Sequence, residues 1–211
     1  MNKITTLLIT AMFTLATSAF AGGMVGVKYG NGDLEGNAKS YVSGTTTYAA
    51  QNGSKDNQFG AIFAEINVKE SPVSIGLEYV PFDADITLDG DASGASANVS
   101  DYTTIYALAM AELASASLYA KVGYSMADIG TVKPNDGQTT INSNSGELEG
   151  LMYGVGIQSK ELGNGIVARA EYTYTEFDDI SVTTTSNGSA SVKKTADGEL
   201  TTLTLSIAKS F

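Results

Sequence analysis

The sequence predicts an all-β fold, an eight-stranded antiparallel up-and-down transmembrane β-barrel. Three observations predict it. Apolar residues alternate with small or polar ones in segments of about ten residues, the length that a tilted strand needs to cross a bilayer. Short and long connections between these segments alternate. No apolar run in the body of the chain is long enough for a spanning helix. The length of 211 residues fits one domain after a short leader.

The leader is a predicted secretory signal peptide at residues 1–21, followed by the barrel domain at residues 22–211. Lys3 supplies a positive charge, an apolar centre runs from Leu7 to Leu15, and Ala19-Phe20-Ala21 forms a small-residue cleavage site. The apolar centre spans about ten residues, whereas a spanning helix needs roughly twenty, so an anchor helix is the weaker alternative. We expect cleavage between Ala21 and Gly22.

The eight predicted strands share a two-residue period. In the third, Val73, Ile75 and Leu77 lie on one face, while small or polar residues lie on the other. The segments are 22–33, 56–68, 73–83, 100–113, 118–129, 150–160, 166–177 and 200–211. Such alternation alone fits a soluble β-sandwich as well as a membrane barrel, because both have one apolar and one wet face.

The connections favour the barrel. Turns of four or five residues at 69–72, 114–117 and 161–165 alternate with long polar connections at 34–55, 84–99, 130–149 and 178–199. Outer-membrane barrels combine tight periplasmic turns with long extracellular loops in this way. We expect the long loops to be mobile, solvated and free of apolar anchors. Asp178 and Asp179 are interpreted as the end of the seventh strand, because Asp favours turns.

Aromatic residues predict where the membrane interfaces lie. An outer girdle is expected on the long-loop side, and its members are Tyr29, Tyr79, Tyr102, Tyr124, Tyr153, Tyr172 and Tyr174. Tyr119 and Phe211 fall at the opposite end and are assigned to the inner girdle. Two facings stay open. The fourth strand presents either Tyr102, Tyr106, Leu108 and Met110 to lipid, or its Ala-rich face. The second strand carries Phe59 and Phe63 on the same face as Glu65.

The chain ends on a strand whose apolar residues are Leu203, Leu205, Ile207 and the final Phe211. This end resembles the C-terminal signature of outer-membrane barrels, although Lys209 stands where that family often has an aromatic residue. With the eight segments and the signal peptide, the mature chain resembles the small eight-stranded outer-membrane barrels of Gram-negative bacteria, which include the OmpA membrane domain, the OmpX and Ail proteins and the opacity-type barrels. The resemblance implies a monomer in the cell outer membrane. The partners it implies are membrane lipid, lipopolysaccharide, periplasmic chaperones and the barrel-assembly machinery.

Six charged residues are expected inside the barrel once the apolar faces point outward. They are Lys28, Glu65, Glu78, Lys121, Arg169 and Glu171. Counted from the periplasmic ends, Glu65, Lys121 and Arg169 form a lower layer, and the other three form an upper layer. The simplest interpretation is an inert network, because an eight-stranded interior is just wide enough for side chains to fill. The alternative, proposed for the OmpA-like family, is a gate in which a cation exchanges partners.

Composition excludes several function classes. The formal net charge of −11 repels phosphate backbones, so nucleic acid is not an expected partner. The outer-membrane enzyme families each depend on a catalytic His, and this chain has no His and no Cys, so we expect neither an enzyme nor a cofactor. Asp89, Asp91 and Ser93 match the opening of a calcium loop, but Ser100 replaces its last ligand, which favours a solvated acidic loop over a loose cation site.

The sequence therefore predicts an integral outer-membrane barrel with a structural and surface-interaction role. Envelope integrity, adhesion or phage contact through four long extracellular loops are the roles that fit it. The alternative is a narrow, gated, porin-like channel for ions or very small solutes, and electrical conductance distinguishes the two.

Overall fold

The computed structural model describes residues 20–43, 45–81, 83–88, 95–130, 133–134, 139–141, 147–186 and 192–211. Eight long strands form the barrel: β1 (Phe20–Ala38), β4 (Gln51–Val68), β5 (Val73–Val80), β7 (Ala95–Glu112), β8 (Ala116–Ile129), β11 (Glu147–Ser159), β12 (Ile166–Ser186) and β13 (Val192–Ser210). The described residues also contain five short strands: β2 (Tyr41–Ser43), β3 (Thr46–Tyr48), β6 (Ala84–Leu88), β9 (Lys133–Pro134) and β10 (Thr139–Ile141). Among the described residues, no helix is long and apolar enough to cross a membrane.

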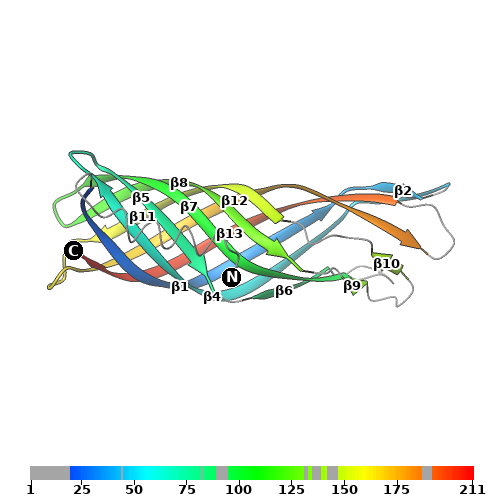
Figure 1. Cartoon of the computed structure of the whole chain (residues 1–211), viewed down its shortest axis with the longest axis horizontal. Helices are drawn as coiled ribbons and strands as arrows, with labels where there is room; N and C mark the ends of the chain where they lie inside the picture. The colour runs from blue at the N-terminus through cyan, green and yellow to red at the C-terminus, as the bar shows by residue number, and fades with distance from the viewer. Residues whose placement is uncertain are drawn as a thin grey trace.

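The long strands close into a barrel with up-and-down topology. Each pairs antiparallel with its neighbours in the order β12, β11, β8, β7, β5, β4, β1, β13, and the pairing of β13 with β12 closes the ring. The ribbon is elongated, with β2, β9 and β10 at one end (Figure 1). The tight turns that join β4 to β5, β7 to β8 and β11 to β12 lie together at the other end, which is the predicted periplasmic side.

The two faces of the wall have opposite character. Val27, Val155 and Leu205 point outward with 61%, 59% and 68% of their surfaces exposed. The alternate positions are buried and largely polar, as Ser125 and Thr204 illustrate. A soluble barrel would bury the apolar face, so this arrangement is that of a wall solvated by lipid.

Two hairpins extend well beyond the predicted strand ends. The ladder between β1 and β4 continues to the pair Ala38 and Gln51, and the ladder between β12 and β13 continues to Thr184 and Val192. Most of 34–55 and 178–199 is therefore strand, and the expectation of long mobile loops was wrong there. The connection 84–99 likewise contains the β6–β7 hairpin.

A cluster of apolar side chains lies inside the barrel at the base of these extensions. Its side chains come from six long strands and are Leu34, Val99, Tyr102, Ala127, Ile129, Leu148, Phe177, Ile180 and Leu200. We call this group the outer cap. Four of its members lie in the predicted loops, so the prediction that these loops lack apolar anchors was also wrong. Outside the membrane the outer face of the wall meets water, and apolar side chains are therefore buried on the inward face.

β-Bulges help to build the outer cap. The register of β12 shifts between Phe177 and Ile180, which leaves Asp178 and Asp179 exposed and both flanking apolar residues turned inward. Asp178 and Asp179 thus mark a bulge within a continuing strand and not the strand end that we expected. A second shift lies in β7 between Ser100 and Thr103, where Asp101 adopts a positive φ of 54°.

Two predictions fall on other parts of the chain. Residues 1–19 of the predicted signal peptide lie outside the described residues, and β1 begins at Phe20. The weak calcium candidates Asp89, Asp91 and Ser93 also lie outside them.

Candidate functional site

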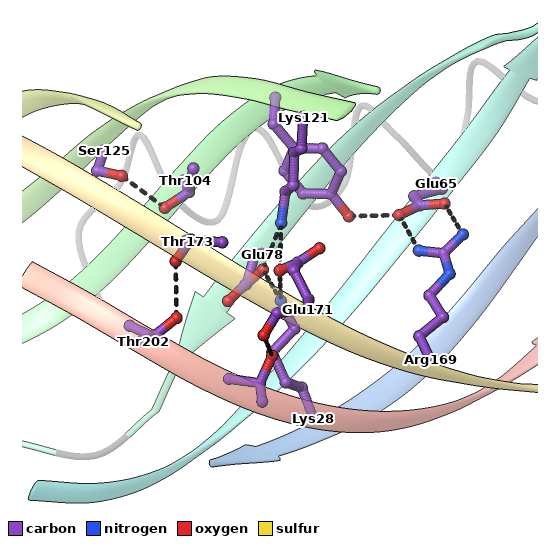
Figure 2. A network of polar contacts seen from close by, with 12 residues as sticks. Lys28, Glu65, Glu78, Thr104, Lys121, Ser125, Arg169, Glu171, Thr173 and Thr202 are labelled. Carbon is purple, nitrogen blue, oxygen red and sulfur yellow. Dashed lines mark hydrogen bonds and ion pairs between the residues drawn. The ribbon is translucent and has the colours of Figure 1, made fainter. Parts of the chain in front are cut away.

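The six charged residues meet inside the barrel. They come from β1, β4, β5, β8 and β12, and each exposes 7% or less of its surface. Figure 2 shows them in two groups, with Arg169 and Glu65 to one side of the other four. Three cations face three anions, so the charges of these six residues balance.

The larger group contains two lysines and two glutamates that share partners. Lys28 Nζ lies 2.6 Å from Glu78 Oε2 and 2.5 Å from Glu171 Oε1. Lys121 Nζ lies 3.0 Å and 3.1 Å from the same two oxygen atoms. Each ammonium thus bridges both carboxylates, which is the arrangement that compensates four charges removed from water.

The smaller group is a two-pronged ion pair. Both terminal nitrogens of Arg169 donate to Glu65, at 2.6 Å and 2.8 Å, and Arg169 Nε donates to Gln158 Oε1 at 2.7 Å. The Tyr106 hydroxyl also donates to Glu65, at 2.8 Å. Planar guanidinium and carboxylate groups match in this geometry, which makes it one of the stronger charge-assisted contacts.

Two tyrosines connect the groups. The Tyr106 ring lies under Lys121 Nζ at 3.8 Å while its hydroxyl bonds Glu65. The Tyr119 ring lies 5.2 Å from the Arg169 guanidinium while its hydroxyl donates to Glu171 at 3.0 Å. Each tyrosine therefore contacts a cation of one group and an anion of the other. Among the described residues, no buried side-chain polar atom lacks a hydrogen-bond partner.

Glycines on neighbouring strands make room for these rings. A Cβ at Gly76 would overlap the Tyr106 ring, and a Cβ at Gly156 would overlap the Tyr119 ring. The sequence showed these glycines on the inward faces, but one sequence does not reveal which ring lies against which glycine. Tyr106 and Tyr119 were for this reason missed as members of the network. Gln158 was placed on the inward face, but its hydrogen bond with Arg169 was missed, because one sequence does not show which side chains meet across the interior.

The layers differ from the predicted ones in one residue. Lys121 was assigned to the lower layer with Glu65 and Arg169, but it pairs with Glu78 and Glu171. Counting from strand ends ignores the stagger between tilted strands, which displaces equivalent positions along the barrel axis. Above the ions lies a layer of hydroxyl groups, in which Thr104 bonds Ser125 at 2.8 Å and Thr173 bonds Thr202 at 2.6 Å.

The predicted aromatic girdle is placed only in part as expected. Tyr29, Tyr124, Tyr153 and Tyr172 are exposed on the outer face, and Tyr79 and Tyr174 are half-buried. Tyr102 instead turns inward, where its hydroxyl donates to Ser125 at 3.0 Å. Tyr119 also faces the interior, not the inner girdle. Aromatic residues suit both places when their hydroxyl finds a partner, so residue type alone does not decide between them.

Burial decides both open facings. On the second strand Phe63 is buried together with Glu65, while Ile62 is exposed, so the face that carries Glu65 points inward. On the fourth strand Tyr106 and Leu108 are buried, while Ala109 and Ala111 are exposed, so the Ala-rich face is the outer one. At the chain end Leu203, Leu205, Ile207 and Phe211 all point outward. Backbone hydrogen bonds of 3.0 Å in both directions join Phe211 to Gly23, so the last residue takes part in closing the barrel.

Lys39 forms ion pairs beyond the membrane wall, at the end with the long hairpins. Lys39, between β1 and β2, donates to Asp179 at 2.6 Å and lies 3.6 Å from Asp197. The hydrogen bond to Asp179 raises the pKa of Lys39 above its ordinary value. Lys39 is therefore charged at neutral pH, and on the alkaline side the pair is lost as the pH rises through that raised pKa.

Comparison with known proteins gives a family match and structural likenesses. The model of the outer membrane protein beta-barrel domain matches residues 4–200. No curated protein matches the sequence.

Among solved structures, the outer membrane protease OmpT of Escherichia coli is 10% identical with a TM-score of 0.53, and the match covers 93% of this chain and 99% of OmpT. Ail of Yersinia pestis is 14% identical with a TM-score of 0.45, covering 90% of this chain and 99% of Ail. The likeness to OmpT extends to the fold alone.

Proposed function

The chain belongs to the outer membrane protein β-barrel domain family, and on that premise we propose that it is a non-enzymatic surface barrel of the outer membrane. Its role is structural and surface-interacting: it supports the envelope and presents its outer hairpins to other cells or phage. The observation that carries this proposal is the filled interior, in which three cations and three anions are all paired. A wall that encloses packed side chains has no open path to offer a solute.

The hairpins are the part of the molecule that meets the surroundings. Beyond the tyrosines, β1, β4, β12 and β13 continue outward and carry polar residues on their outer faces. The tip strands β2 and β3 add an exposed Val42 and a stacked pair, Tyr41 and Tyr48, with ring centroids 4.7 Å apart. A rigid sheet presents such groups in fixed positions, which lowers the entropic cost of binding a partner.

Lipopolysaccharide is a proposed partner of the outer face. Glu35 of β1, Glu199 of β13 and Glu176 of β12 lie directly opposite one another across the ladders. Like charges in that register repel each other. No group of three or more acidic side chains among the described residues is arranged to hold a metal ion by itself, so a divalent cation would relieve the repulsion by joining one of these glutamates to a lipid phosphate. Export with cleavage after Ala21, periplasmic chaperones, the barrel-assembly machinery and a monomeric state complete the proposal.

The test combines conductance with hairpin truncation. Refolded protein in planar bilayers should give no single-channel events. In cells, replacing residues 39–50 by a two-residue turn should abolish adhesion or phage adsorption while the barrel still fractionates with the outer membrane. The matched control replaces the periplasmic turn 69–72, which should leave surface binding unchanged. Steady conductance from the unaltered chain would instead favour the channel.

A further inference from the structure

The inward side chains change character from one end of the barrel to the other. Along β12, from the periplasmic side, they run from Arg169 and Glu171 through Thr173 and Thr175 to Phe177. Along β8 they run from Lys121 through Ser125 to Ala127 and Ile129. The interior thus has three levels in sequence: ions, hydroxyl groups and the apolar outer cap.

The outer cap lies directly against the hydroxyl level. The Tyr102 ring meets Phe177 edge-on, with centroids 6.4 Å apart and an interplanar angle of 79°. The hydroxyl of the same Tyr102 donates to Ser125 at 3.0 Å. One side chain therefore belongs to the cap by its ring and to the polar level by its hydroxyl, and Ser125 beneath it has an exposed fraction of 0%.

The three levels differ in whether their side chains can form hydrogen bonds with water. Charged and hydroxyl groups are able to exchange one hydrogen-bond partner for a water molecule. An apolar constriction offers water no partner and excludes it by dewetting. Rearrangement among the ion pairs would leave the cap closed above them.

We propose that the outer cap, and not the ion network, is the seal that keeps external water and ions out of the barrel interior. This inference concerns which level of the interior excludes water, whereas hairpin truncation tests the surface role, so the two proposals fail in different experiments. The ion network then serves to hold the wall together beneath a seal of a different chemical kind.

The test introduces a single cysteine. The chain contains no cysteine of its own, so any labelling reports on the introduced thiol alone. Ser125→Cys places a thiol just beneath the cap. A charged, membrane-impermeant methanethiosulfonate is added from outside to the folded full chain in lipid vesicles. The label should react slowly with Ser125→Cys. Adding Phe177→Ser should speed the reaction more than about tenfold, because local opening governs the exposure of a buried group.

Phe63→Ser is the matched control. Phe63 is as buried as Phe177, at 5% exposed, but it lies among Met24, Val167 and Ala208 at the periplasmic end. Its removal should leave labelling from outside unchanged, as should Arg169→Ala. Folded protein is separated by its heat-modifiable gel mobility, and Leu200→Ser replaces Phe177→Ser if that variant does not fold.

Three results would overturn the proposal. They are fast labelling with the cap unaltered, no acceleration in either cap variant, and acceleration by Arg169→Ala alone. The last would assign the seal to the ion network. None of these results bears on surface binding, and a failure of the surface role would leave the labelling pattern unchanged.

Discussion

Arg169 and Glu65 form a two-pronged ion pair across the barrel interior although 104 residues separate them in the chain. Arg169 and Glu65 expose only 5% and 1% of their surfaces. Strands that are distant in sequence thereby become linked through the interior as well as through the wall. Loss of one partner leaves the other charge buried, which costs far more than loss of a surface pair.

Arg169→Ala should lower the free energy of unfolding by about 3–5 kcal/mol, because Glu65 keeps only the Tyr106 hydroxyl as a partner. Urea titration of the protein in lipid vesicles measures the loss. Replacing both residues, as in Arg169→Met with Glu65→Leu, should cost less than the single change, since no charge is then stranded. Equal stability of Arg169→Ala and the unaltered chain would contradict the paired network.

Gly76→Ala should destabilise the barrel by about 1–3 kcal/mol, because the added methyl group overlaps the Tyr106 ring and forces it from Glu65 and Lys121. The matched control is Gly198→Ala, where the nearest atom to the new Cβ lies 3.3 Å away. The same urea titration compares the two. If they cost the same, the ring does not depend on the glycine.

Val155→Arg tests the lipid face, where Val155 is 59% exposed. A charged side chain near the bilayer midplane should cost about 2–4 kcal/mol. Val42 is exposed to 60% on the tip strand β2, so Val42→Arg makes the same change outside the membrane and should stay within about 0.5 kcal/mol. Refolding into vesicles measures both. Equal costs would mean that β11 does not cross the bilayer at this point.

The sequence predicted the features that depend on a two-residue period. Alternation located all eight barrel strands and turned residues such as Lys28 and Glu78 inward, because lipid accepts only one face of each strand. The same rule failed beyond the membrane, where the polar face turns outward and Leu34 or Leu200 turns inward. A polar strand of this kind has the composition of a loop.

The sequence also did not predict which way some aromatic side chains face, or where the β-bulges lie. Tyr102 and Tyr119 were assigned to girdles, but each finds hydrogen-bond partners inside, and a single sequence does not show those partners. Asp178 and Asp179 carried a signal for a break in the ladder, and a bulge satisfies that signal as well as a strand end does.

The extended hairpins predict a specific pattern of protease resistance. Lys55 lies in the ladder opposite Leu34, and Lys194 lies opposite Val182, so neither peptide segment is free to adopt the conformation that a protease binds. Trypsin added to intact cells should therefore cut slowly after both residues, although the sequence alone suggested exposed loops. Mass spectrometry of the released peptides measures the cleavage rates, and the heat-unfolded chain, in which both sites should be cut rapidly, is the control. If cleavage after Lys55 is as fast in the folded protein as in the unfolded chain, the β1–β4 ladder does not extend beyond the membrane, and the outer cap would lose the hairpin that carries Leu34.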